Sequence, residues 1–396
     1  MTKGQVGLLA GFAALAPLAI DMYLPALPPL AADLGASVEQ AGSSVSVFLI
    51  GIAGGQLVAG PLSDRLGRKP LFLTGLVLFA LSATVAALTT SFAVLLVARL
   101  LQAFGACSAM VSGRAIVRDR LDATESAKFF SLLALVGGMA PVLAPLLGAA
   151  LIQFGNWRLI FWVMAGFAAL LVVGGGAALP ESRSAETAAK ARAEHPFVAY
   201  WALISNRSVA GYLLAAMCNS AAFFSYVANS SVVLVDGYGF TPTEFSVIFG
   251  VNSVALIGAA QINRRMLKTR SVDALLALSA RNALILAALL LFFILTGIGG
   301  IWSFLALLFF FVGSITPVQA NTMAGGLAHA DLRAGSCAAL FGAATFAGGA
   351  AASWIAGLLY DGTDRGLGVV VAVCLVGAAA AIRLVVLRPP VASQPA

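Results

Sequence analysis

The stretch Gly60-Pro-Leu-Ser-Asp64-Arg65-Leu-Gly67-Arg68-Lys69-Pro70 is a short charged turn between two long apolar runs. Small residues at Gly60 and Gly67 allow helices to approach closely and the chain to turn sharply. The flanking runs, residues 41–62 and 71–90, are each long enough to cross a bilayer, which takes about 20 residues. The stretch therefore predicts two membrane-spanning helices joined by a charged turn. On these residues alone, the turn is also consistent with a simple charged loop.

The rest of the chain repeats this alternation of apolar runs and polar turns. The 396 residues are 61% hydrophobic and 10% charged, with a mean hydropathy of +0.99, whereas soluble domains are about 25% charged. Twelve spans are predicted, at residues 4–28, 41–62, 71–90, 92–117, 127–154, 159–179, 209–235, 245–266, 274–295, 301–324, 333–359 and 367–387. The predicted fold class is an all-α membrane protein with twelve transmembrane helices.

The same composition excludes most soluble enzymes. His195 and His329 lie in polar segments, and each cysteine stands alone in an apolar run: Cys107, Cys218, Cys337 and Cys374. This distribution predicts no metal site, disulfide framework or nucleophile paired with histidine. We therefore expect no catalytic residue and no cofactor. A channel is disfavoured too, because the spans are dominated by Ala, Leu, Val and Gly.

The basic residues divide between two sets of loops. One set holds Lys3, Arg65, Arg68, Lys69, Arg118, Arg120, Lys128, Arg183, Lys190, Arg192, Arg207, Arg264, Arg265, Lys268, Arg270, Arg333 and Arg388. The other set holds only Arg158 and Arg365. By the positive-inside rule, the first set and both termini are cytoplasmic, as expected for a multi-pass protein of a bacterial inner membrane. The pI of about 9.5 is thus explained by topology, with no nucleic-acid partner, and a signal peptide is the disfavoured interpretation of the first run.

The chain divides into two similar halves. The most polar stretch, Pro180 to Pro196, predicts a cytoplasmic linker at 181–206 between six-helix bundles at 1–180 and 207–396. The halves echo each other, since Gly137-Gly138 recurs as Gly348-Gly349 and the Asp64-Arg65 turn recurs loosely at Asn263-Arg264-Arg265. Tandem repeats of this kind are expected of a transporter whose halves move about a central site.

Asp21 is the one acidic residue placed well inside an apolar span. A carboxylate in that position is energetically costly and indicates function by default. Burial favours the neutral acid and a nearby cation favours the carboxylate, so such a group can bind and release a proton. The alternative is a structural aspartate that backbone groups near Pro25 satisfy.

Arg99 is the expected cation near Asp21. Span one runs outward and span four inward, which places both residues about 10 Å from the outer surface at 1.5 Å per residue. Proton coupling is therefore assigned to Asp21 and Arg99. Arg281 is a further intramembrane cation, for which a snorkelling structural role is as good an interpretation as a functional one.

Aromatic and amide side chains at helical spacing form a candidate binding wall. They are Tyr23, Phe48, Gln102, Asn219, Phe223 and Tyr226. Asn219 and Phe223 are four residues apart and share a helix face. For each residue alone, helix packing or lipid contact is the better explanation. Together they predict a site for a small amphipathic molecule between the halves.

The turn at 60–70 resembles the G-x-L-x-D-R-x-G-R-K-x motif of the major facilitator superfamily at every specified position. The resemblance implies a conformational latch formed by Gly60, Asp64, Arg65, Gly67, Arg68 and Asp119. Asp64 would face the positive end of a helix in the second half, and Arg68 would pair with Asp119 at the cytoplasmic end of span four.

Three further stretches are similar to narrower patterns of that superfamily. Arg99-Leu-Leu-Gln102-Ala103-Phe-Gly105 resembles R-x-x-Q-G-x-G, with alanine at the first glycine. Residues 140–149 resemble the G-x-x-x-G-P-x-x-G-G motif of drug/proton antiporters, with Pro141, Pro145 and Gly148 present and alanine at three of the four glycines. The patterns at 19–28 and 113–119 resemble the bicyclomycin-resistance (Bcr/CflA) group.

These resemblances imply a proton-coupled antiporter that exports small amphipathic drugs of the bicyclomycin, chloramphenicol or sulfonamide type by alternating access. We expect its partners to be the drug, protons and the lipid bilayer, and we expect a monomer. An exporter of a physiological metabolite such as an amino acid, with drugs as incidental cargo, remains the alternative.

Overall fold

The computed structural model describes residues 3–184, 196–330 and 333–387, and in these ranges every regular element is a helix. The elements are α1 (Lys3–Phe12), α2 (Leu15–Asp21), η1 (Leu24–Ala26), α3 (Leu27–Asp33), α4 (Val38–Leu66), α5 (Arg68–Leu88), α6 (Phe92–Arg120), α7 (Ala123–Phe154), α8 (Trp157–Ala178), α10 (Pro196–Ser205), α11 (Arg207–Ser231), η2 (Val232–Gly237), α12 (Pro242–Met266), α13 (Val272–Thr296), α14 (Gly300–Ala328), α15 (Ala334–Leu358), α16 (Arg365–Ala381) and η4 (Ile382–Val386).

Twelve of these helical segments are membrane spans. Eleven are long and apolar enough to cross a bilayer by length and composition, and α7 adds the twelfth, with an apolar section at Met139–Phe154. The predicted all-α fold of twelve transmembrane helices is confirmed. Of the predicted linker 181–206, residues 185–195 lie outside the described ranges, as do the predicted basic residues Lys190, Arg192 and Arg388.

The first span is a broken helix. It runs through α1, α2, η1 and α3, and the α2 segment ends at Asp21. Proline lacks a backbone N–H and cannot continue a helical hydrogen-bond ladder, and Pro25 and Pro28 follow the second break closely. Broken spans at membrane depth are tolerated where they face a cavity or the protein interior, so this span already indicates the position of a site.

Two helices at equivalent places in the halves begin in the same way. Ser37 caps α4 in a capping box with Gln40, and Thr241 caps α12 in a capping box with Glu244. Each box satisfies two backbone N–H groups that the first helical turn leaves free. The shared capping pattern adds to the internal similarity that the sequence suggests.

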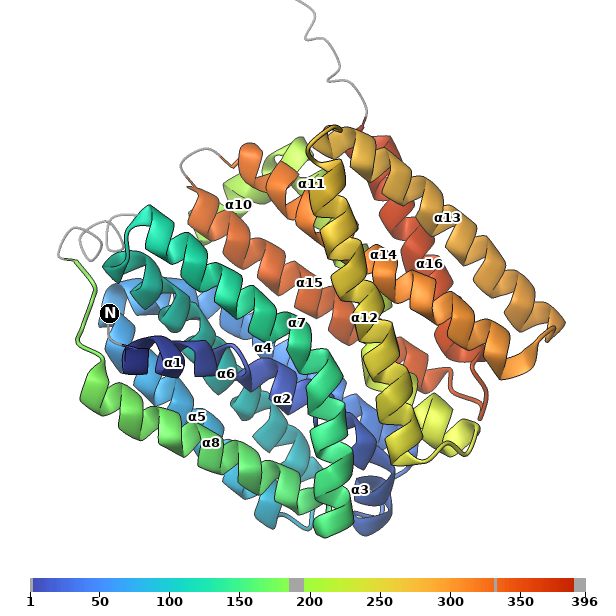
Figure 1. Ribbon diagram of the computed structural model, residues 1–396, viewed down its shortest axis with the longest axis horizontal. Helices are drawn as coiled ribbons and strands as arrows, with labels where there is room; N and C mark the ends of the chain where they lie inside the picture. Colours follow the sequence, from blue (N-terminus) through green and yellow to red (C-terminus); the bar gives the residue numbers. More distant parts are fainter. Residues whose placement is uncertain (1–2, 185–195, 331–332, 388–396) are drawn as a thin grey trace, which may run out of the picture.

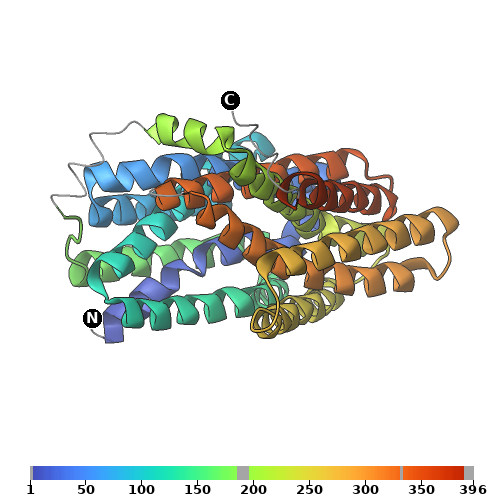
Figure 2. The same cartoon turned by 90° about the horizontal axis from the view of Figure 1, so that it is seen from above.

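The helices form two bundles (Figures 1 and 2). In the first, α5 packs on α6 and α8, and α4 packs on α6. In the second, α11 and α13 each pack on α14 and α16. The bundles meet along two helix pairs, α4 with α15 and α7 with α12.

The bundles are joined most tightly at one side of the molecule. Ser46 of α4 and Ser353 of α15 share a hydrogen bond of 2.5 Å, and Ser246 of α12 donates to the Pro145 carbonyl of α7 at 3.1 Å. Figure 1 shows α7 and α12 meeting near the Phe154 end of α7 and diverging toward the other side. We call the closed side the far face. The other side carries Arg65, Arg118 and Arg264 and is called the basic face.

The short helix α10 connects the bundles on the basic face. Its Tyr200 hydroxyl donates to the Leu57 carbonyl of α4 at 3.1 Å. Phe197, Val198 and Trp201 on the same helix are exposed. Part of the segment that was expected to be a plain linker is therefore a helix with an apolar surface.

Candidate functional site

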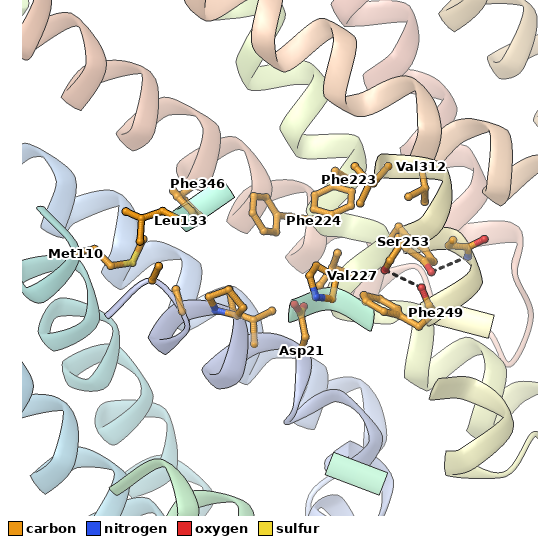
Figure 3. Close-up of a pocket in the computed structure, with 18 of the residues that line it drawn as sticks. Asp21, Met110, Leu133, Phe223, Phe224, Val227, Phe249, Ser253, Val312 and Phe346 are labelled. Atoms are coloured by element: carbon orange, nitrogen blue, oxygen red, sulfur yellow. Dashed lines mark hydrogen bonds between the residues drawn. The ribbon is translucent and has the colours of Figure 1, made fainter. Parts of the chain in front are cut away.

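A cavity of about 610 Å³ lies between the two bundles. Figure 3 shows its lining, which comes from the broken first span and from helices of both halves. Among the described residues, Asp21 is the one acidic residue in the lining, and aliphatic and aromatic side chains form most of the rest. A largely apolar cavity with few polar groups is the usual form of a small-molecule site.

Asp21 is the last residue of α2 and is 7% exposed. Figure 3 shows its side chain directed across the cavity toward Val227 of α11. Among the described residues, its carboxyl makes no hydrogen bond and no ion pair. The structural alternative, an aspartate satisfied by nearby backbone groups, is thus wrong for this state. The carboxyl is available to a proton or to a molecule in the cavity.

Arg99 is fully buried and lies beside the same break in span one. Its guanidinium donates to the Ala19 carbonyl at 2.8 Å and to Gln102 Oε1 at 2.7 Å. It also stacks over the rings of Tyr23 and Phe48, at 4.6 and 4.4 Å from their centroids. Arg99 therefore caps the end of α2 and forms no ion pair with Asp21. The predicted pairing of the two side chains is therefore not formed among the described residues in this state, and Arg99 instead binds a backbone carbonyl that the interrupted helix leaves free.

Two of the predicted wall residues line the cavity, namely Phe223 and Tyr226 of α11. Tyr226 stacks on Phe249 with ring centroids 5.6 Å apart, and its hydroxyl accepts from Asn252 Nδ2 at 2.9 Å. Tyr226 is thereby held against α12 with its ring at the cavity wall.

The other four wall residues are absent from the cavity lining, which corrects the expectation for them. Tyr23 shares a hydrogen bond of 2.9 Å with Ser44, and Phe48 packs on the Arg99 guanidinium. Gln102 binds Arg99, and Asn219 donates to the Ile315 carbonyl of α14 at 3.1 Å. Helical spacing shows which residues share a face, but it does not show whether that face meets a cavity or a neighbouring helix.

Sequence reasoning missed several lining residues. They are Phe224, Phe249, Asn252, Phe346 and Arg114. Asn252 and Arg114 could have been found, since each is a strongly polar residue inside an apolar span. The phenylalanines carry no such signal, because phenylalanine is equally common at helix interfaces and toward lipid.

The turn at 60–70 has the internal pairing expected of the latch. Arg68 is 3% exposed, pairs with Asp64, and donates through Nε to Asp119 at 3.1 Å. A further bond joins Arg68 to Ser63 Oγ at 3.2 Å. The predicted Arg68 to Asp119 pair is therefore present in the structure.

Within the described ranges, no hydrogen bond or ion pair joins the Asp64 side chain to the second half in this state. A second cavity, of about 460 Å³, opens on the basic face, and its lining includes Asp64 and Gly60 from α4 and Arg333 and Gly335 at the start of α15. Asp64 and the first turn of α15 are thus separate walls of one opening. The α15 N-terminus has no side-chain cap, so its partial positive charge is available to an anion.

Glu181, which follows α8, holds the latch turn and was not predicted. Its carboxylate accepts from the backbone N–H groups of Arg68 at 3.0 Å and Lys69 at 3.3 Å, and also from Ser182 and Arg183. Partial burial raises the pKa of Glu181, but these four hydrogen bonds outweigh it and leave the pKa below its usual range. Gly67 permits the turn with φ +118°, and the Arg65 carbonyl accepts from Arg183.

The three motif residues of α7 surround the break in span one and the contact between the halves. Pro141 lines the central cavity, and the Pro145 carbonyl accepts from Ser246 of the second half. A Cβ atom at Gly148 would overlap the Met22 carbonyl oxygen. Gly148 is therefore where α7 crosses the backbone of the broken span, directly after Asp21.

Two six-helix bundles around a central cavity, with a polar break in one span, define a membrane transporter of the alternating-access class. Comparison with known proteins agrees, because residues 9–352 match the Major Facilitator Superfamily pattern. The chain belongs to this superfamily. It is a transporter and not an enzyme.

Similar proteins indicate which group within the superfamily the chain resembles. The chain is 36% identical over 338 residues to an uncharacterized MFS-type transporter, YdgK, of Bacillus subtilis, with 85% of this chain and 84% of the relative covered. It is 30% identical to a bicyclomycin resistance protein homolog of Haemophilus influenzae, with 85% and 84% covered. It is 34% identical to the multidrug resistance protein MdtL of Escherichia coli, with 60% of each chain covered. The resemblance to the bicyclomycin-resistance group is thereby confirmed.

Solved structures share the fold. A D-xylose–proton symporter superposes with a TM-score of 0.76 at 15% identity, covering 96% of this chain and 97% of that one. The nucleoside transporter NupG gives a TM-score of 0.73 at 16% identity, covering 96% and 98%.

Proposed function

We propose that this transporter exports small amphipathic drugs, of the bicyclomycin, chloramphenicol or sulfonamide type, in exchange for protons. The observation that carries the proposal is Asp21, an isolated carboxyl at a helix break that faces an aromatic cavity between the halves. An apolar cavity suits an amphipathic molecule. A carboxyl without a fixed partner can release its proton when that molecule binds, and can take up a proton again when the molecule leaves. The names of the relatives, bicyclomycin resistance and multidrug resistance proteins, support a drug as cargo.

The sidedness follows from the distribution of arginine and lysine. We assign the basic face and both termini to the cytoplasm of a bacterial inner membrane, in agreement with the positive-inside rule. The structure then represents an inward-open state, since the helix pairs close the far face while a cavity opens on the basic face. The bundles 1–180 and 207–396 are taken as the two moving bodies of a monomer, and 181–206 as their connection.

Asp21 and Arg99 have different roles in this scheme. Asp21 carries the proton. Arg99 is a positioning residue that holds the end of α2 through the Ala19 carbonyl, two residues before Asp21. Of the predicted wall residues, Phe223 and Tyr226 contact the drug directly, while Tyr23, Phe48, Gln102 and Asn219 stabilise the surrounding helices.

The proposal is tested with purified protein in vesicles. Vesicles that contain the protein, loaded with chloramphenicol and given an imposed pH gradient, should move the drug faster than protein-free vesicles, and a protonophore should remove the difference. Equal rates in the two kinds of vesicle, repeated with bicyclomycin and a sulfonamide, would contradict drug export. Drug movement that the protonophore leaves unchanged would contradict proton coupling alone.

The latch gives a prediction about conformation. In the outward-open state the bundles close on the basic face, and Asp64 can reach the uncapped N-terminus of α15. Asp64→Asn removes the charge that favours this contact, worth about 0.3–1 kcal/mol at a helix terminus. An energy of that size changes the ratio of the two states about two- to fivefold, so we expect the ratio of inward-open to outward-open protein to rise by about this factor.

Spin labels at Leu66→Cys and Gly335→Cys report the shift. Leu66 is 59% exposed, and a Cβ at Gly335 would meet no neighbouring atom. Double electron–electron resonance should show more of the long distance in Asp64→Asn than in the parent. The same distance distribution in both proteins would reduce the turn to a charged loop that only sets topology.

A further inference from the structure

Arg114 is a cation inside a membrane span, on α6, which ends at Arg120. Six residues of helix place it about 9 Å from that end. It lines the central cavity and also the cavity that opens on the basic face. Arg114 therefore stands between the entrance and the drug site.

The guanidinium of Arg114 has no partner among the described residues. Within the described part of the chain it makes no hydrogen bond and no ion pair, whereas Arg99 and Arg68 are each held by several groups. Asp64, the acidic residue that lines the basic-face cavity, already pairs with Arg68. A charged residue at membrane depth is costly and indicates function by default. An arginine that faces two cavities at membrane depth, with five donors that no described residue uses, is suited to a carboxylate or a similar anion.

The approach to Arg114 is positively charged. Arg118 and Arg333 line the basic-face cavity together with Arg114. A cleft lined by one sign of charge raises the local concentration of ions of the opposite sign. The entrance therefore favours anions over cations.

Aromatic side chains of the second half complete the site. Three phenylalanines line the central cavity together with Arg114, namely Phe223, Phe224 and Phe346. The ring of Phe224 packs between the other two, with its centroid 5.3 Å from that of Phe223 and 5.1 Å from that of Phe346. The cavity thus offers an aromatic surface for an apolar body and a guanidinium for a charged end.

We propose that Arg114 binds an anionic group of the transported molecule, so that amphipathic organic anions form a substrate class of this transporter. This inference rests on the proposed function, because it assigns a ligand to the same cavity. The aromatic body of the ligand lies on the phenylalanine cluster. Its carboxylate accepts hydrogen bonds from Arg114 and comes from the cytoplasm through the basic-face cavity.

Dansylglycine and its neutral amide test the proposal as a matched pair. Both carry the same fluorescent naphthalene body, whose emission reports an apolar site, and at neutral pH only the first carries a carboxylate. Binding is measured on the purified protein. Because a hydrogen bond to a charged group adds about 1.5–3 kcal/mol, the parent should bind the carboxylate at least about tenfold more tightly.

Three variants identify the residue. Arg114→Gln should weaken dansylglycine binding by about tenfold and leave amide binding unchanged, and the unchanged amide shows that the protein is folded. Arg114→Lys should retain most of the preference. Arg281→Gln removes a cation from a span that lines neither cavity, and it should behave as the parent does.

Each other outcome counts against the proposal. Equal binding of the two compounds by the parent, or equal loss of both in Arg114→Gln, would overturn it. Chloramphenicol transport in the same preparation separates the two levels. Chloramphenicol transport without a preference for the carboxylate would contradict the anion site but not drug export. No transport and no binding would contradict both proposals.

Discussion

In the Asp21→Asn variant, we expect proton-driven drug transport to fall to the rate of protein-free vesicles. Asparagine has nearly the shape of aspartate but cannot take up and release a proton. The carboxyl makes no hydrogen bond or ion pair with the described residues, so its replacement should leave folding and the cavity intact. Transport under an imposed pH gradient measures the loss.

Drug binding at equilibrium gives a second measurement. If proton and drug exclude each other, acidification should weaken drug binding to the parent, because protonated Asp21 dominates at low pH. Binding to Asp21→Asn should not depend on pH in this range. Asp33→Asn is the matched control, since Asp33 ends α3 of the same broken span but pairs with Arg158 on the far face. We expect the control to keep pH-driven transport. Parental rates in Asp21→Asn would move the proton site elsewhere.

The number and positions of the spans could be predicted from the sequence because each is a long apolar run between charged turns. The predicted span 41–62 became α4, Val38–Leu66, which continues through Asp64 and Arg65, so the turn itself is confined to Gly67 before α5 begins at Arg68. The breaks in span one were not predicted. Proline content marks such a span as irregular, but the exact end of α2 depends on what its free carbonyls bind, here Arg99.

Two of the six predicted wall residues line the cavity, and the incomplete prediction has a related reason. Asp21 and Arg68 stand out because charge inside or beside a membrane has few structural uses. Aromatic residues have many, and whether Phe48 or Phe224 faces the cavity is decided by how two bundles pack. Arg114 was overlooked as a site residue although it carries the same signal as Asp21.

The structure explains why the α7 motif has glycine at one position and tolerates alanine at the others. Alanine replaces three of the four glycines at positions 140, 144 and 149, and Ala144 and Ala149 are buried without conflict. Glycine is kept at position 148, where the Met22 backbone leaves no room for a Cβ. A Cβ at this position would collide with backbone, and moving a side chain cannot relieve that collision. Gly148 therefore controls how closely α7 packs on the break after Asp21.

Gly148→Ala should therefore have a large effect from a single methyl group. The methyl can be accommodated only if α7 or the broken span shifts, and such overpacking costs about 1–3 kcal/mol. We expect a melting temperature several degrees lower, at about 2–4 °C per kcal/mol, and transport below about a tenth of the parental rate because Asp21 is displaced. Gly166→Ala is the matched control, since Gly166 lies exposed within α8 with no atom near its Cβ position. Alanine favours an exposed helix by up to about 1 kcal/mol over glycine, so the control should melt at the same or a higher temperature and transport normally. If the two alanine variants had the same stability and the same transport rate, α7 would not cross the broken span as closely as we describe, and the kept glycine would have no packing role.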